Sequence, residues 1–342
     1  MRKGDSEQAK AAGPKAAAEA RKREARAQWW LPDLPREELR ALMKRNNHHA
    51  ALSHGLWLVL LGASGWLAVR LYPSGWAIPA FLLYGTLYST CNPRWHESLH
   101  GTPFKVGWLN DIIYFFAAAM EFRDVVFARF SHLNHHAWTI MTDRDLEIST
   151  PRPVRMWKLW LDFFSLYQVA VFFPILVLHA LGIPSRNARR VVPESKYGRM
   201  FWAARGALAL YVAAVVLAVA LRSWLPVLLF GLPRIYGGVL IFLFVLPQHA
   251  GLAQNVADHR RSTRTLILGP VFSFLYMHME YHIEHHLYPN VPFHALSKLH
   301  GLIRHRLPAP YRGLWPAWKE MIPALMRQRR DPEYLIERPV PQ

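Results

Sequence analysis

Eight of the 18 histidines in this 342-residue chain lie in three short clusters whose spacing suits metal binding. The clusters are His96-Glu-Ser-Leu-His100, His132-Leu-Asn-His135-His136 and His282-Ile-Glu-His285-His286. Residues three or four apart are neighbours on a helix, so we expect each cluster to present its imidazoles on one face. Neutral imidazole is a common ligand of iron, zinc, copper and nickel. Eight imidazoles exceed what one ion can use, so the pattern favours two metal ions, and a pair of irons sharing histidine ligands is the natural interpretation.

Acidic residues lie close to these clusters along the chain. A metal-binding imidazole usually donates its other N–H to a carboxylate or a carbonyl, which fixes its orientation. We expect this role of Glu97, Asp143, Asp145, Glu147, Asp258 and Glu284. The run 142–147 follows the second cluster directly, and a solvated loop is its alternative interpretation. The basic residues Arg260, Arg261 and Arg264 would bind an anionic group or simply face lipid headgroups.

The elements that must position these clusters are long apolar segments. Five of them approach the roughly 20 residues that a membrane-spanning helix requires. They are 51–72, 74–92, 160–181, 200–221 and 225–247. The chain is therefore interpreted as an integral membrane protein. The clusters can meet only on one side of the bilayer, so the number of crossings between them must be even.

The order of the segments predicts two membrane hairpins. One joins 51–72 to 74–92, and the other joins 200–221 to 225–247. Segment 160–181 contains Asp162, Gln168, Pro174 and His179, so we interpret it as re-entrant or interfacial, with a true span as the rival. The expected fold class is thus all-α and integral to the membrane. It has about four transmembrane helices, interfacial helices and a cytoplasmic, histidine-rich cap.

Composition and charge refine this organisation. The single cysteine excludes a disulfide framework, a Cys-ligated iron–sulfur cluster and a thiolate zinc site within the chain. We attribute the net charge of +18 to the excess of Lys and Arg that membrane proteins carry on their cytoplasmic side, and not to nucleic-acid binding. We expect a bacterial inner-membrane protein with its N-terminus and clusters in the cytoplasm. Its regions would be a basic N-terminal tail (1–50), a membrane domain (51–305) and a cytoplasmic C-terminal tail (306–342).

The three clusters carry a family resemblance. HESLHGT, HLNHHAWT and YHIEHHLYPNVP resemble, in order and type, the histidine boxes of the membrane fatty-acid desaturase superfamily. The segment QHAGLAQNVADHRRSTRT is similar to that of bacterial rhizobitoxine-type desaturase-like members. The resemblance implies a non-haem di-iron centre. It also implies O₂-dependent desaturation or hydroxylation of a fatty-acyl or similar apolar chain.

The resemblance also implies a ninth ligand near the end of the last span. His249 is preferred for this role, and His259, which follows Asn255 in an N-x-x-x-H arrangement, is the rival. His278, one turn before the third cluster, would support the ligands from outside. The implied metal ligands are His96, His100, His132, His135, His136, His249, His282, His285 and His286. No site role is assigned to His48, His49, His54, His179, His294, His300 or His305.

Substrate and electrons would have to come from outside the chain. Trp95, Trp138 and Tyr281 flank the clusters and would line a channel for the apolar substrate, unless they are ordinary packing residues. The sequence has no flavin or nicotinamide fingerprint and no fused cytochrome b5 haem motif. The expected donor is a ferredoxin with its reductase, or a cytochrome b5-type protein, drawn to a basic surface.

Three other activities share part of this pattern. His96-Glu97-Ser-Leu-His100 is also the H-E-x-x-H signature of zinc proteases, but that interpretation leaves the other two clusters unexplained. A haem or metal transporter would place its ionisable groups inside the spans and not beside them. A hydroxylase or ketolase of the same superfamily differs from a desaturase only in how the substrate is positioned.

Overall fold

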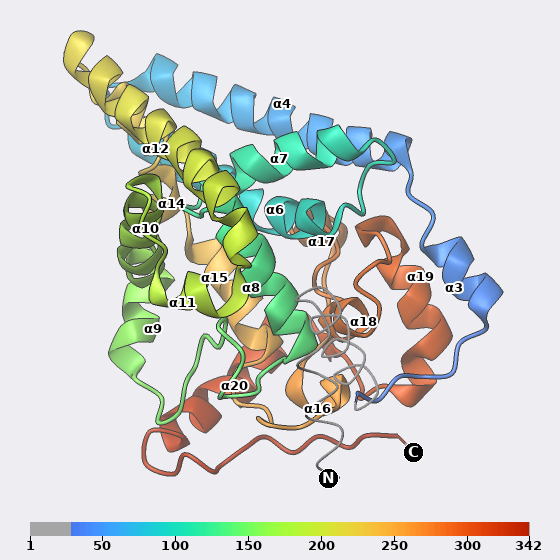
Figure 1. Ribbon diagram of the computed structural model, residues 1–342. Helices are drawn as coiled ribbons and strands as arrows, with labels where there is room; N and C mark the ends of the chain where they lie inside the picture. The colour runs from blue at the N-terminus through green and yellow to red at the C-terminus, as the bar shows by residue number, and fades with distance from the viewer. Residues whose placement is uncertain (1–28, 342) are drawn as a thin grey trace.

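Two long apolar helices run across one side of the molecule in the computed structural model, which describes residues 29–341 (Figure 1). They are α4 (Asn47–Leu71) and α12 (Tyr197–Ala220), and each lies in a run long and apolar enough to cross a membrane. Apolar side chains such as Val59 on α4 and Val219 on α12 are exposed. A bilayer would cover these faces, because each helix also matches its hydrophobic thickness.

A hairpin and a return helix bring the first histidine cluster to the centre of the molecule. α4 packs against α5 (Ala77–Ser89), as expected for the first hairpin. α5 leads directly into α6 (Cys91–His100), which carries the first cluster and ends at Gly101 with a left-handed φ of 68°. α7 (Gly107–Ala119) then packs back against α6. The cluster therefore sits on a short helix held between its two neighbours.

The expected four membrane helices are not confirmed within the described residues. Two helices pass the length and hydropathy requirements, and a third passes only if a bent pair is counted as one span. The pair is α9 (Met156–Phe163) and α10 (Leu166–Ala180), bent by 82°. A bend of this size is compatible with the re-entrant segment expected over 160–181 and equally with a broken span.

The apolar stretch 225–247, expected as one membrane helix, is divided into short pieces. They are α13 (Leu225–Leu229), α14 (Pro233–Tyr236), α15 (Val239–Val245) and the 3₁₀ turn η2 (Leu246–Gln248). The chain turns at Gly231, which has a φ of 91°, and Gly237 then lies so close to α5 that a Cβ there would be 1.9 Å from the carbonyl carbon of Gly85. α14 thus packs backbone to backbone against α5, which a continuous helix with larger side chains does not allow.

The remaining helices are short, and α16 to α20 lie together below the long helices in the view of Figure 1. Two two-residue strands, β1 and β2, pair in parallel and are the only strands among residues 29–341. The elements not yet given are α3 (Arg36–Leu42), α8 (Val125–Ala137), α11 (Arg186–Val191), η1 (Glu194–Lys196), α16 (His259–Ser262), β1 (Leu266–Ile267), α17 (Pro270–Leu275), α18 (His282–Leu287), α19 (Phe293–Ile303), η3 (Arg304–Arg306), β2 (Tyr311–Arg312) and α20 (Leu314–Arg327).

The described parts of both expected tails pack onto this body. α3 and Trp30 contact the apolar cluster formed by α18 and α19, and the Tyr288 hydroxyl donates to the Pro32 carbonyl at 3.0 Å. Met321 and Leu325 of α20 share a buried cluster with Leu246 of η2. The segments before and after the membrane helices therefore help to hold the histidine-bearing elements. Residues 1–28 of the expected N-terminal tail lie outside the described residues.

Candidate metal centre

The nine histidines expected as ligands converge from four separate segments into two adjacent groups. Within each group, one nitrogen of every imidazole lies within 4.8 Å of one nitrogen of each of the others. The first group contains His96, His100, His132, His136 and His285. The second group contains His135, His249, His282 and His286. We call these the five-histidine group and the four-histidine group.

Helix geometry explains why each H-x-x-H-H box contributes to both groups. On α8, His132 and His136 are four residues apart and belong to the five-histidine group, whereas His135 belongs to the four-histidine group. On α18 the arrangement is reversed. His282 and His286 belong to the four-histidine group, and His285 belongs to the five-histidine group. Each residue turns the helix by about 100°, so positions i+3 and i+4 point to opposite sides of position i. The three rings of each box therefore share one face about 100° wide but divide between the two groups.

Several imidazoles have their outer nitrogen fixed by an acceptor. Nδ1 of His132 lies 2.9 Å from Oε2 of Glu147, and Nδ1 of His135 lies 2.8 Å from Oδ2 of Asp145. Nδ1 of His249 lies 2.9 Å from the carbonyl oxygen of residue 262. In each case the proton sits on Nδ1, which leaves Nε2 free to bind a metal.

The inward Nε2 atoms of different rings lie close to one another. Nε2 of His132 lies 3.0 Å from Nε2 of His136, and Nε2 of His249 lies 3.1 Å from Nε2 of His282. Burial is the main cause that lowers the pKa of His249 to about 3 and holds the pKa values of the other three far below their usual range. Nε2 of His282 also lies 3.1 Å from Nε2 of His286, so one ring proton cannot serve every contact, and a cation is the partner that fits each group. All-nitrogen donors suit iron, zinc, copper or nickel and not magnesium or calcium.

Asp145 has the strongest electrostatic effect on the imidazole that it holds. Burial alone would lower the pKa of His135, but the charge and hydrogen bond of Asp145 outweigh it and raise this pKa. The same carboxylate also accepts the backbone N–H groups of Ile140 and Glu147, each at 2.8 Å. The loop after the second cluster, expected either to support the ligands or to be solvated, therefore folds back onto them.

Glu97 does not occupy the position of a zinc-protease base. Its carboxylate accepts the Thr102 hydroxyl at 2.8 Å and the Phe293 backbone N–H at 3.2 Å. Oε1 lies 3.9 Å from Nδ1 of His285, on the outer side of that ring. Burial raises the pKa of Glu97 to about 7. The H-E-x-x-H sequence thus lacks the inward-facing acid that peptide hydrolysis requires.

The other acids expected near the site have different partners. Asp143 is exposed beside Arg144, whereas Asp258 caps α16 and pairs with Arg260. Glu284 is buried and binds His300, and it also accepts the Thr265 hydroxyl at 2.6 Å. None of these three carboxylates is bonded to a histidine of the two groups in the described chain.

The two rivals for the ninth position are separated by the geometry. His249 belongs to the four-histidine group, and His259 lies outside both groups. The His259 ring lies 5.0 Å from that of His286 and stacks on Trp29 at 4.1 Å. His278 lies against Tyr281 and away from the groups.

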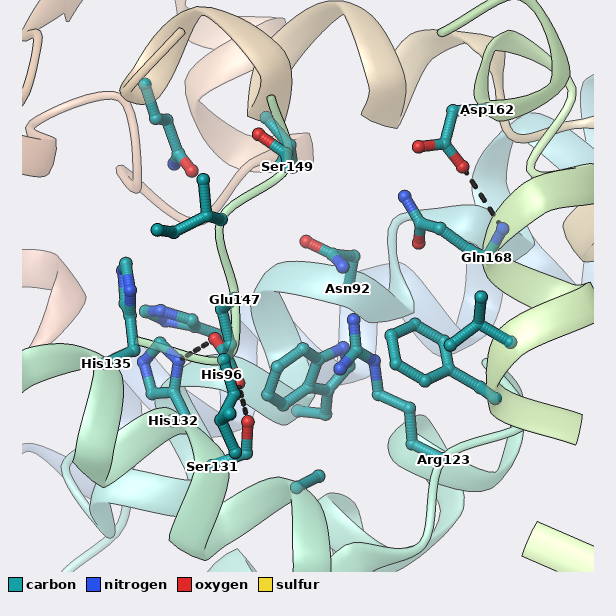
Figure 2. A pocket seen from close by; sticks show the side chains of 18 of the residues that line it. Asn92, His96, Arg123, Ser131, His132, His135, Glu147, Ser149, Asp162 and Gln168 are labelled. Carbon is teal, nitrogen blue, oxygen red and sulfur yellow. Dashed lines mark hydrogen bonds and ion pairs between the residues drawn. The ribbon is translucent and has the colours of Figure 1, made fainter. Parts of the chain in front are cut away.

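One cavity of about 310 Å³ reaches both groups. Its wall includes His96 and His132 from the five-histidine group and His135, His249 and His282 from the four-histidine group. Figure 2 shows the histidines on one side of this pocket, Asp162 and Gln168 on the other, and Arg123 with Asn92 between them. A substrate in this cavity would therefore lie directly against the metal-binding groups.

Of the three aromatic residues expected along a channel, Trp95 lines this cavity. Tyr281 packs against His300, and Trp138 stacks with Arg144. The basic residues before the third box do not form a shared anion site either. Arg260 stacks on Trp30, whereas Arg264 is buried and donates to the carbonyl groups of residues 247 and 250. Arg264 thereby holds the segment that carries His249.

The sequence interpretation missed a buried polar cluster around Glu121. The Glu121 carboxylate accepts hydrogen bonds from the Trp95 indole at 2.7 Å and from the Asn92 amide at 3.0 and 3.1 Å. It also pairs with Arg123 and Arg234, each at 3.3 Å. The sequence signal that could have indicated this cluster is the charge-rich run 121–124, which directly follows an apolar helix.

Two comparisons with known proteins agree with this site. The family model described as fatty acid desaturase matches residues 73–318, which contain all nine histidines. A human fatty acid desaturase 2-like protein, FADS2B, is 21% identical over 291 residues, covering 76% of this chain and 59% of the relative. The chain thus spans about three fifths of the length of that relative. The chain belongs to the fatty acid desaturase family.

Proposed function

We propose that this protein is an O₂-dependent membrane desaturase with two non-haem irons, one held by each histidine group. The observation that carries the proposal is that two groups of buried or half-buried imidazoles lie side by side and open onto one cavity. The ligands would be the nine histidines named above. When bound, the irons would supply the activation of O₂ that removes hydrogen from an unactivated C–H bond.

The protein's own residues would position the irons and the substrate. Glu147 and Asp145 hold the Nδ1 protons of His132 and His135, so these rings keep their metal-binding nitrogen inward. The cavity wall would orient the chain to be oxidised. The proposed product contains a new C=C bond in a fatty-acyl or similar apolar chain. The hydroxylase or ketolase reaction is the alternative.

Further features of the proposal concern the setting of the enzyme. We propose a bacterial inner-membrane protein with its N-terminus and histidine boxes in the cytoplasm. We also propose a desaturase domain over 51–305 between the tails 1–50 and 306–342. The net charge of +18 supports docking of an acidic ferredoxin, with a cytochrome b5-type donor as the alternative. The segment before the third box supports a relationship to rhizobitoxine-type members.

The test is expression of the full chain in a bacterial host together with a ferredoxin and its reductase. Mass spectrometry of lipids and soluble metabolites would detect a loss of two hydrogens for a desaturase or a gain of one oxygen for a hydroxylase. The purified protein should contain two irons per chain, and His286→Ala should lose both iron and product. One zinc per chain, or activity retained without the histidine, would contradict the proposal.

A further inference from the structure

The cavity contains a cationic side chain that the metal-binding role does not use. The Arg123 guanidinium lies between two aromatic rings, with Cζ 4.5 Å from the centre of Trp95 and 4.2 Å from that of Phe172. Its Nε donates to Glu121 at 3.3 Å. Within residues 29–341 its two Nη atoms have no hydrogen-bond partner, and Figure 2 shows the guanidinium pointing into the pocket toward Asn92. The aromatic clamp thus fixes the group and leaves its donors facing the cavity.

Arg123 shares its directly paired carboxylate with a second guanidinium group. Glu121 is a single carboxylate shared by Arg123 and Arg234, and both Glu121 and Arg234 are almost fully buried. Arg234 also donates from Nη2 to the Gln168 side chain at 3.1 Å. One carboxylate therefore serves two guanidinium groups, and within residues 29–341 it contacts Arg123 through Nε and not through the Nη atoms. An anion in the adjacent cavity would supply the acceptor that the Nη donors of Arg123 lack.

The acids that line the same cavity are already engaged elsewhere. Asp162 accepts the backbone N–H of Gln168 at 3.1 Å, and Glu147 holds His132. Asp124 caps α8 and binds His179 at 2.9 Å. A further cation, Lys158, lines the wall as well. The wall thus carries charges of both signs, and among the described residues the Nη donors of Arg123 are the groups that remain free for a negative ligand.

This cationic group lies close to the metal-binding imidazoles. The Trp95 indole that stacks on Arg123 has its ring centre 5.8 Å from that of His96 and 6.0 Å from that of His132. The indole ring of Trp95 therefore lies between the guanidinium group and the five-histidine group. The cavity volume, about 310 Å³, is at the lower end for ligand pockets. An anion held here would belong to a small molecule, and its oxidised carbon would be only a few bonds from the charge.

We propose that Arg123, supported by Glu121 and Arg234, is an anion subsite that binds the free carboxylate of the substrate. The two Nη groups of a guanidinium match the two oxygens of a carboxylate, which gives both charge recognition and a fixed orientation. The substrate class is therefore a compact organic acid and not an acyl chain esterified to a large carrier. This inference rests on the proposed function for the reaction, but the binding step does not depend on turnover.

The experiment compares binding of acids with binding of their neutral esters. The full chain, purified in detergent, is titrated with unbranched saturated carboxylic acids of about four to ten carbons and with the matching methyl esters, and tryptophan fluorescence is followed. We expect the wild-type protein to bind the best acid at least tenfold more tightly than its ester. Arg123→Gln should abolish most of this preference, and Arg123→Lys should retain part of it. Arg155→Gln, which removes an exposed arginine outside the cavity wall, is the matched control and should change nothing.

Two results would overturn the subsite. One is equal binding of acid and ester by the wild-type protein, which needs no variant and so decides the question even where Arg123→Gln fails to fold. The other is an acid preference that survives unchanged in folded Arg123→Gln, as judged by its melting temperature. The proposed function is tested separately. Acid binding that depends on Arg123, without any oxidation of the acid, would refute the proposed reaction and keep the subsite. Oxidation of esters that bind as tightly as the acids would support the reaction and refute the subsite.

Discussion

Replacing Asp145 with asparagine should weaken one metal site and leave the other intact. Asp145 holds Nδ1 of His135, which belongs to the four-histidine group, at 2.8 Å and is itself buried. Asparagine keeps the size of the side chain but removes the charge that favours an Nδ1 proton. A hydrogen bond to a charged group contributes about 1.5–3 kcal/mol, so the metal affinity of this group should fall by about tenfold to hundredfold.

The matched variant is Glu147→Gln, because Glu147 makes the same contact with His132 of the five-histidine group at 2.9 Å. Asp143→Asn is the control, since Asp143 is an exposed carboxylate in the same loop. Iron retained per chain would be measured against increasing concentrations of a chelator. Each of the two buried-acid variants should show one weakened and one wild-type iron, while the control shows two wild-type irons. Equal weakening of both irons by both variants, or no weakening by Asp145→Asn, would refute the assignment of these acids to separate groups.

Three further predictions concern stability and partners. His179→Ala should lower stability by about 1–3 kcal/mol without changing the iron content, because it leaves buried Asp124 without its partner; thermal unfolding and metal analysis would check both. Gly237→Ala should prevent folding, since its Cβ would collide with the backbone of Gly85, whereas Gly198→Ala has open space and should express like the wild type; the yield of folded protein decides this. If a basic surface steers an acidic ferredoxin, added salt should slow ferredoxin-dependent turnover but not turnover with a small neutral reductant.

The histidine spacing predicted the site better than it predicted its internal arrangement. The three boxes indicated which residues would come together, because H-x-x-H-H already carries the helical period. That each box serves both groups follows from the 100° turn per residue, but only the relative positions of α8 and α18 show which ring faces which group. Sequence spacing contains no information on how two helices distant in the chain are oriented.

The membrane segments show the opposite limitation. Hydropathy predicted one membrane helix over the apolar stretch 225–247. The structure divides this stretch into α13, α14, α15 and η2. The divided stretch makes a close contact between Gly237 and Gly85, which are far apart in the chain, and a hydropathy average does not detect it. The sequence did not predict the cluster of Glu121, Arg123 and Arg234 for the same reason. Arg234 lies on α14, far along the chain from the end of α7, and meets Glu121 only in the folded protein.

Metal binding and folding of the cap should be one coupled process. Nine imidazoles, six of them buried, come from α6, α8, α18 and the end of η2, and their inward nitrogens make more close contacts than shared ring protons can satisfy. Such contacts do not favour the folded chain by themselves, since a buried acceptor without a donor is destabilising. A cation in each group turns the same contacts into favourable ones, so its binding free energy becomes folding free energy. The metal requires segments and ring orientations that the protein itself fixes, through Arg264, Asp145 and Glu147.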